Sequence, residues 1–543
     1  MQSKWLGRIG LSALVMGVAC SSGAVVGCAA ERDPINRVQL NAIPKSFLVG
    51  ENYTDAKDDP EFYARSMLIR VPYGQSGGDS LLFTNSINSV SKIKWQIQED
   101  KLIGRVSFER IVGTDGQGKN TTTNGSPDPK KPLAQNDGLV VYEFRVESQF
   151  DIRRGYNSGT GEENNVVEEN SSDRPWVQRD YVRVDFSKNM VTTAYDFDTL
   201  SLLGLYNAID YAPLEFDIRN PDDPNAPQFD LDKGYFDVTN KLFANPKMLD
   251  LGGFIFPGCM LPNLISGGTS PSGNCNPNEL TIRHSFKKVV DTDYEPLDWD
   301  GQKFEAYGAF ETEREGYARD YGTVDKLHKR YISRYNIWER SHHYTDPKNM
   351  TGATACKVDE DCTTIGSVKG MSHCDQAREM CSLPFKERVA KPIVWHYADG
   401  SPDLYFDSNR EAAEEWDTAM RGAVAVAKYA ECKRYTPDED CGDVITGNFS
   451  DEEDSLYLVK EINACKRGEV QGTAPAQCDA LADQLGQQRG YSSAVVALAK
   501  AKPMVMLCHS PVSDKDPTEC GAVGTVARLG DLRYHLVTAI ATP

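Results

Sequence analysis

The distribution of cysteine constrains this chain more than any other feature of its sequence. Ten of its 14 cysteines fall after residue 350, and four of these crowd the polar stretch from Cys356 to Cys381. A stretch this polar cannot build a hydrophobic core, and disulfides are the usual substitute in proteins that fold in an oxidising compartment. We therefore expect an exported protein that is crosslinked by disulfides.

Spacing along the sequence predicts how the cysteines pair. Neighbouring cysteines are expected to form local disulfides, namely Cys259 with Cys275, Cys432 with Cys441, Cys465 with Cys478, and Cys508 with Cys520. Two more are expected within the quartet Cys356, Cys362, Cys374 and Cys381, whose three possible connectivities stay open. A zinc knuckle is the alternative for the quartet, but its intervals are longer than the CxxC pairs of structural zinc sites.

The N-terminus has the features of an export signal. Lys4 and Arg8 accompany a short apolar run, residues 9–19, which is too short to cross a bilayer. Two cysteines, Cys20 and Cys28, compete as the processing site. The mature protein is therefore expected to begin after this segment.

Cys28 fits a bacterial lipoprotein signal better than Cys20 does. Such signals place an aliphatic residue three positions before the cysteine and a small residue directly before it, as Val25 and Gly27 do here. Cleavage before Cys28 would leave an acylated cysteine that holds the protein on a lipid bilayer. Ordinary cleavage around Ala29 or Ala30 is the alternative. Because Ala29 rather than aspartate follows Cys28, we expect an outer-membrane or cell-surface location.

The charge balance limits the partners of the chain. It carries 79 acidic and 59 basic residues, a net charge of −20, whereas nucleic-acid binding draws on clustered Lys and Arg. Nucleic acid is therefore not an expected partner. Hydrophobic residues at 40% and charged residues at 25% are ordinary for a folded chain, and 543 residues allow several domains.

The expected fold class is α+β, with a β-rich, sandwich- or barrel-like N-terminal region. Alternation of apolar and polar residues at 91–97, 102–108 and 140–146 is typical of half-buried antiparallel strands. Polar stretches rich in Gly, Asn and Asp predict long loops at Gly113–Asp137 and Asn157–Asp173. The first half should therefore form one or two β domains.

The pattern changes after residue 385. Pro392–Tyr397 predicts a strand, and a helix is expected from Ser408, which has capping-box spacing to Glu411. Its apolar face is expected to comprise Ala412, Trp416, Ala419, Ala423, Ala427 and Ala430.

Further helices are predicted after Ser450, with Leu456, Val459, Ile462 and Cys465 inward, and at Ala476–Gln487. A final strand is predicted at Asp531–Ile540. The expected division is a signal peptide at 1–27, a tether at 28–45, a β-rich region at 46–350, a small disulfide-rich segment at 351–385, and an α+β region at 386–543.

The sequence carries no recognised catalytic motif. HExxH, GxSxG, a Walker loop and a dinucleotide fingerprint are all missing. His342 and His343 would point apart as neighbours, so we expect surface imidazoles there. Cys508 and His509 have the composition of a thiol nucleophile with a base, but a disulfide is the preferred interpretation for Cys508.

Seven segments stand out in order along roughly residues 170–543. They are Pro175–Ser187, which reads PWVQRDYVRVDFS, then Asp293–Pro296, Tyr307–Arg314, Arg334–Trp338, Lys391–Trp395, Trp416–Met420 and Gly530–Tyr534. Taken together, these segments resemble a family of large bacterial surface lipoproteins with a zinc-dependent metalloprotease-like domain. The specificity of the resemblance lies in the order of these pieces more than in any one of them.

The resemblance implies that the C-terminal region is the upper lobe of a zincin domain. In the family, the HExxH helix lies further toward the C-terminus, so this chain is expected to be truncated and to lack the zinc ligands and the general-base glutamate. No catalytic residue carries over, and zinc is expected only in a complete family member.

The resemblance also suggests one binding element. A possible edge strand for an extended peptide substrate comprises Gly530, Asp531, Leu532, Arg533 and Tyr534. The alternative is an interior strand whose partner lies beyond Pro543.

Two hypotheses follow from these observations. The first is a membrane-anchored exported lipoprotein that resembles the N-terminal part of a zinc metalloprotease and is inactive as it stands. The alternative is a non-catalytic cell-surface lipoprotein that binds proteins or polymers. Both place the acylated Cys28 in a bilayer and allow a polypeptide ligand.

Overall fold

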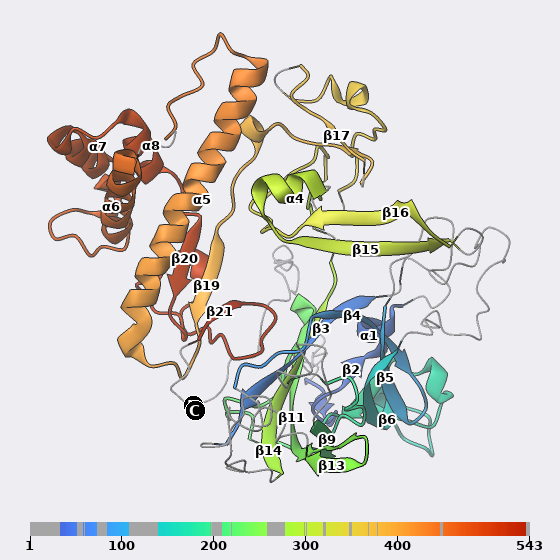
Figure 1. Cartoon of the computed structure of the whole chain (residues 1–543). Helices are drawn as coiled ribbons and strands as arrows, with labels where there is room; N and C mark the ends of the chain where they lie inside the picture. The colour runs from blue at the N-terminus through green and yellow to red at the C-terminus, as the bar shows by residue number, and fades with distance from the viewer. Residues whose placement is uncertain are drawn as a thin grey trace, which may run out of the picture.

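The computed structural model has a β-rich half built from the N-terminal part of the chain and a helical half built from the C-terminal part (Figure 1). It describes residues 33–538 except 52–57, 59, 73–83, 108–138, 196, 198–208, 219, 258–276, 291, 298, 300, 319–321, 347–349, 367–368, 377 and 446–448. The expected α+β class is confirmed, with disulfides in the middle and C-terminal segments.

A twelve-stranded, mostly antiparallel sheet forms the first half. Nine strands follow one another in the order β1-β7-β6-β5-β4-β3-β14-β11-β10, while β2 and β8 branch from β6, and β9 from β11. The bounds are β1 Ile35–Asn36, β2 Ile43–Pro44, β3 Glu61–Arg70, β4 Ser91–Ile97, β5 Lys101–Val106, β6 Val140–Tyr156, β7 Glu163–Asn170, β8 Tyr181–Asp185, β9 Ile209–Leu214, β10 Gln228–Asp230, β11 Tyr235–Pro246 and β14 Asn278–Lys288.

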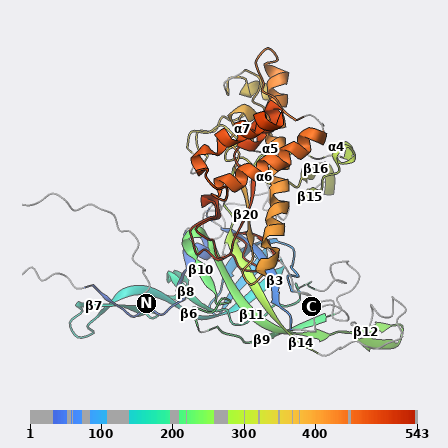
Figure 2. The ribbon, with the colours of Figure 1, turned by 90° about the vertical axis from the view of Figure 1, so that its left-hand side faces the viewer.

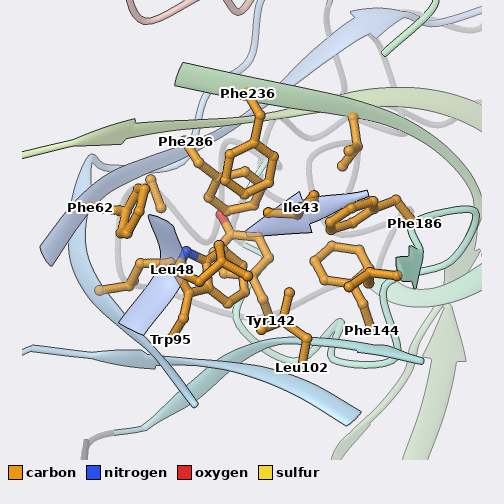
Figure 3. Packing of buried hydrophobic residues seen from close by; sticks show 14 of the residues in the cluster. Ile43, Leu48, Phe62, Trp95, Leu102, Tyr142, Phe144, Phe186, Phe236 and Phe286 are labelled. Carbon is orange, nitrogen blue, oxygen red and sulfur yellow. The ribbon is translucent and has the colours of Figure 1, made fainter. Parts of the chain in front are cut away.

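This half-barrel curls around an aromatic core (Figure 3). Phe286 is central, with its ring centroid 4.7 Å from that of Phe236, 4.9 Å from Tyr142 and 5.0 Å from Trp95. Edge-to-face and offset contacts of this kind add to the free energy gained by burying apolar area. Packing of large side chains therefore holds the first half together.

The alternation in the sequence predicted these strands well where one face is buried. Residues 91–97 form β4 as expected, and the described part of the strand expected at 102–108 lies largely in β5, Lys101–Val106. The loop expected at Asn157–Asp173 is wrong, because Glu163–Asn170 forms β7 and pairs with β6. None of the β7 side chains is fully buried, so its sequence shows no period-two alternation. Gly113–Asp137 lies outside the described residues.

The tether expected at 28–45 is wrong over its described part. β1 pairs with β7, and β2 pairs with β8. The side chain of Ile43 lies in the aromatic core, and the helix α1, Lys45–Val49, follows at once. The chain therefore joins the half-barrel well before residue 46.

A middle segment connects the two halves. It contains the helix α4 (Gly301–Tyr307) and the hairpin β15 (Glu311–Ala318) with β16 (Gly322–Ile332), whereas the hairpin β12 (Met248–Leu251) with β13 (Phe254–Pro257) belongs to the half-barrel, between β11 and β14. The disulfide-rich segment follows, with the two short strands β17 (Cys374–Asp375) and β18 (Met380–Cys381). Neither strand of this pair is long enough to bury a core of its own, as its polar sequence predicted.

The C-terminal half has a three-stranded parallel sheet covered by helices. Its strands lie in the order β20-β19-β21, with bounds Val505–Cys508, Ile393–Tyr397 and His535–Val537. The helices are α5 (Phe406–Tyr435), α6 (Phe449–Lys466), α7 (Cys478–Arg489) and α8 (Ser493–Lys500). Among the described residues, no helix combines the length and apolar character that crossing a membrane requires.

The helix α5 begins earlier and buries a different face than its sequence predicted. It starts at Phe406 rather than Ser408, and no side chain caps it. The expected apolar face is largely exposed to solvent, with Trp416 55% exposed. Ala413, Asp417 and Arg421 face inward instead.

A buried ion pair explains the inward face of α5. Arg421 donates to Asp417 at 2.6 Å and to the carbonyl oxygen of Ala499 at 2.9 Å, and Asp417 accepts from the backbone N–H of Met504 at 2.6 Å. Asn463 of α6 contacts both charged groups. Because each charge has several hydrogen-bond partners, the pair can occupy a core position that apolar residues would usually fill.

Candidate functional site

A cavity of about 300 Å³ lies where the middle segment meets α5. Three of the segments singled out in the sequence converge on it, those that begin at Asp293, Arg334 and Trp416. The lining residues are Tyr294, Glu295, Ser333, Arg334, Tyr335, Asn336, Ile337, Trp338, Ser341 and Met420. This convergence makes the cavity the leading candidate site.

The apolar wall of the cavity is held by packing and backbone pairing. Trp338 is buried, forms a bridge to Ala390, and has its ring centroid 5.7 Å from that of Phe385. The carbonyl oxygen of Ile337 accepts from the N–H of Lys391 at 2.8 Å. These contacts fix the stretch after β16, which has no regular secondary structure of its own.

Glu295 forms the polar side of the cavity and is fully paired. One carboxylate oxygen lies 2.5 Å from His373 Nε2, and the other accepts from Arg388 at 2.6 Å. Burial opposes ionisation of this carboxyl group, but the hydrogen bond from His373 and the Arg388 guanidinium outweigh it and lower its pKa to about 2. Glu295 is therefore ionised at neutral pH.

His342 is buried between two carboxylates beside the cavity. Its Nδ1 contacts Asp293, and its Nε2 lies 3.0 Å from Asp375. Because both ring nitrogens face carboxylate oxygens, the imidazolium form, which donates from both, fits best. Burial lowers the pKa of His342, but the hydrogen bonds to Asp293 and Asp375 prevail and raise it. For Asp293, burial is likewise outweighed, by the hydrogen bonds from His342 and from the backbone of Ser341, and the pKa falls to about 2.

The expectation of a surface imidazole is wrong for His342, whose side chain is 0% exposed. The carboxylates that contact its ring belong to Asp293 and Asp375, which are distant in the sequence. His343 does turn away from its neighbour, since its Nδ1 lies 3.2 Å from Thr354 Oγ1. No local pattern around His342 reveals these distant carboxylates.

One arrangement here has the connectivity of a hydrolase triad. Ser382 Oγ lies 3.0 Å from His373 Nδ1, and His373 in turn contacts Glu295. A serine nucleophile must be reachable by its substrate. Ser382 is 0% exposed, and its Oγ also contacts the backbone N–H and C=O of His373. The arrangement therefore fixes the disulfide-rich segment against the irregular stretch that contains Glu295.

The zinc knuckle considered for the cysteine quartet does not fit the described residues. Cys356, Cys362 and Cys381 are the described group whose potential ligand atoms lie close enough together for a metal ion. Cys356 is bonded to Cys374, and Cys362 to Cys381, so these sulfur atoms are not thiolate ligands. These bonds settle the connectivity of the quartet in favour of disulfides over a zinc knuckle.

The other cysteine expectations have two outcomes. The predicted pairs Cys432–Cys441, Cys465–Cys478 and Cys508–Cys520 are all present. Cys28, Cys259 and Cys275 lie outside the described residues, so the lipidation site and the remaining pair stay predictions.

The expected edge strand at Gly530–Tyr534 is wrong, because these residues form a turn and the strand β21 begins only at His535. Arg533 donates to Asp531 at 2.7 Å, to Gln228 at 2.8 Å and to Asp230 at 3.1 Å. The turn is therefore docked on the end of the half-barrel and is not available to pair with a peptide.

Gly530 makes this docking possible. Its φ is +84°, and a Cβ atom there would lie 3.3 Å from Cβ of Arg283 and 3.4 Å from Cβ of Met67. The adjacent Arg528 contacts the buried Asp237, and its guanidinium also donates to the carbonyl oxygen of Ala226 at 2.8 Å. The positive φ favours glycine here, and a side chain would also crowd the two neighbouring strands.

A second buried histidine lies in the half-barrel. His284 Nδ1 is 2.8 Å from Ser66 Oγ, and its Nε2 is 3.3 Å from the hydroxyl of Tyr195. Burial without a nearby carboxylate lowers the pKa of His284 to about 3, and burial raises the pKa of Tyr142 to about 12. The ring is therefore neutral, and its enclosure makes it part of the core.

Comparisons with protein-family models, with curated proteins and with solved structures give no match for this chain.

Proposed function

We propose that this chain is an exported, lipid-anchored protein that binds a polypeptide segment and does not cleave it. The acylated Cys28 would hold it on the outer membrane or the cell surface, with the β half-barrel following closely behind the anchor. The five disulfides among the described residues support an oxidising compartment.

The observation that carries the binding proposal is the convergence of three sequence segments on one cavity. About 300 Å³ is at the lower end of the range for ligand pockets, roughly 300–1,000 Å³. Ile337, Trp338 and Met420 offer apolar walls, while Arg334 and Tyr335 lie exposed at the rim. A space of this size suits one large apolar side chain of a polypeptide.

The ionised groups next to the cavity support binding rather than catalysis. Glu295 and His342 already have hydrogen-bond partners on two sides, so neither is free to exchange a proton with a substrate. Their role in this proposal is to keep the cavity walls rigid, which lowers the entropic cost of binding.

Titration with unfolded β-casein tests the binding. Met420→Trp should fill the cavity and weaken the affinity by roughly tenfold or more, since the ligand loses the space for its anchor side chain. Trp416→Ala, on the exposed face of the same helix, is the matched control and should leave the affinity unchanged. Equal affinities of the wild type and Met420→Trp, or no binding by either, would contradict the proposal. So would zinc-dependent cleavage of the casein.

The anchor has its own test. Wild-type protein and Cys20→Ser should incorporate labelled palmitate, whereas Cys28→Ser should not. Incorporation by Cys28→Ser, or its absence from the wild type, would show that Cys28 is not the acylated residue.

A second candidate function is that of the N-terminal part of a zinc-dependent peptidase. It is favoured by the seven segments that resemble the metalloprotease-like lipoproteins and follow one another in the same order. An antibody against residues 290–340 would then detect a protein well above 60.2 kDa in the membrane fraction. A band near 60 kDa would count against this candidate.

A further inference from the structure

The hairpin β12–β13 carries a cluster of exposed apolar side chains. Phe254 is 64% exposed, Ile255 62% and Met248 57%. Large apolar side chains gathered on one protruding element mark contact surfaces more often than scattered exposed ones do. We therefore expect this hairpin to contact a partner or a phase that accepts apolar side chains.

The hairpin is built to present this tip. Leu249 and Phe256 pair across the two strands and pack on the half-barrel core, which anchors the base. Gly252 and Gly253, both with positive φ, make the turn, and Asp250 accepts from the N–H of Gly253 at 2.7 Å. Asp250 is the one charged residue between Met248 and Pro257, and this hydrogen bond at the turn occupies its side chain.

The position of the hairpin favours a lipid surface. Cys28 lies five residues before Asp33, so at most ~18 Å of extended chain separates the acyl anchor from the first described residue. The next element, β1, pairs with β7, and Figure 2 shows β7 and β12 along the same lower edge of the molecule, away from α5–α7. A bilayer close enough to hold the anchor would therefore run along the edge that carries the hairpin.

We propose that the tip of the β12–β13 hairpin, with Phe254 and Ile255, inserts into the acyl–headgroup boundary of the membrane that holds the anchor. This inference rests on the proposed lipid anchor and deepens it. An inserted hairpin would add to the membrane affinity of the acyl anchor, because each additional apolar group that is buried contributes to the free energy of binding. Interfacial elements bury aromatic and aliphatic side chains at this boundary, where Asp250 can stay at headgroup level.

Photo-crosslinking in intact cells tests the insertion. Benzoylphenylalanine is introduced at position 254, at position 255, or at position 310 as a matched control, since Phe310 is 83% exposed but lies next to β15. We expect a phospholipid adduct at 254 and 255, with a yield at least roughly tenfold above that at 310, because only the first two sites lie in the apolar phase.

The outcomes separate the two proposals. Lipid adducts at 254 and 255 but not at 310 support the insertion, whereas a protein adduct or no adduct at 254 and 255 overturns it. Palmitate incorporation, measured on the same samples, reports on the anchor alone. A palmitoylated protein without lipid adducts therefore leaves the anchor standing and removes the hairpin contact.

The double variant Phe254→Ser with Ile255→Ser provides a second readout. Both side chains are exposed, so the fold should persist. We expect the acylated protein to exchange out of phosphatidylethanolamine–phosphatidylglycerol vesicles roughly tenfold faster than wild type, as the loss of two inserted side chains predicts. Phe310→Ser should exchange at the wild-type rate, and an unchanged rate for the double variant would contradict the insertion.

Discussion

The half-barrel and the C-terminal half solve the problem of stability in different ways. In the half-barrel, rings such as Trp95, Phe236 and Phe286 pack against one another inside a hydrogen-bonded sheet (Figure 3). The C-terminal side, from the disulfide-rich segment onward, holds all five described disulfides and the buried Asp417–Arg421 pair. The difference teaches that a polar sequence can still be ordered, provided that crosslinks and paired charges replace apolar area.

Reduction of the disulfides should produce the largest difference in stability between the two halves. Each disulfide contributes about 2–4 kcal/mol, and a whole domain is stable by roughly 5–15 kcal/mol, so losing all five should unfold the C-terminal side. In dithiothreitol we expect amides of α6 and α7 to lose protection from hydrogen exchange, while those of β3 and β14 keep it. Simultaneous loss in both halves would show that they unfold as one unit.

Phe286→Ala should have the next largest effect, and in the opposite half. Removing a fully buried phenylalanine costs about 3–5 kcal/mol, because apolar contacts are lost and a cavity remains. Denaturant unfolding monitored by hydrogen exchange should show that the amides of β11 and β14 lose more protection than those of α6. Phe310→Ala, at an exposed site, is the control and should change stability by less than about 0.5 kcal/mol.

Asp417→Ala should destabilise the C-terminal half by about 3 kcal/mol, because it leaves the buried Arg421 without its carboxylate partner. Glu411→Gln is the matched change on the same helix. It removes an exposed ion pair with Lys460, and its effect on thermal unfolding should be too small to detect. Equal effects of the two changes would contradict the buried-pair account of α5.

The smallest predicted effect is a pH dependence of opposite sign around His342 and in the half-barrel. The raised pKa of His342 stabilises its surroundings fully below pH 6.5, and this contribution is lost as the pH rises through the folded value. The lowered pKa of His284 acts in reverse, since its contribution is present above pH 6.5 and lost as the pH falls toward 3. Hydrogen exchange measured at pH 6 and pH 8 should therefore show less protection around His342 at the higher pH, and no such loss in the half-barrel.

His342→Gln is the control for this measurement. It should remove the loss of protection near Asp293 between pH 6 and pH 8 and leave the half-barrel unaffected. The same pH profile in the variant would mean that another group titrates there.

The sequence predicted what depends on short range. Strands with one buried face show alternation, as in residues 91–97, and cysteines close in sequence pair locally, as Cys465 and Cys478 do. Prediction from the sequence failed where contacts between residues distant in the sequence determine which side chains are buried. The buried face of α5 carries Asp417 because backbone N–H groups after α8 reach it, and no helical pattern encodes that contact.

Prediction of the candidate site from the sequence failed for the same reason. The segment that begins at Asp293 was visible as a motif, but its pairing with His342 and His373 requires the fold. A carboxylate two positions from another carboxylate, Asp293 and Glu295, was the available signal, because such a pair in a core needs cationic partners.

The turn at Gly530 also sets an order of assembly. Asp237 and Arg283 are buried in the half-barrel, and the partners they contact include Arg528 and the carbonyl oxygen of Leu529. Synthesis runs from the N-terminus, so the chain must be made as far as Leu529 before these charges gain those partners. This end of the half-barrel is therefore completed by residues that follow it by more than 200 positions in the sequence, as the 246-residue separation of Arg283 and Leu529 shows.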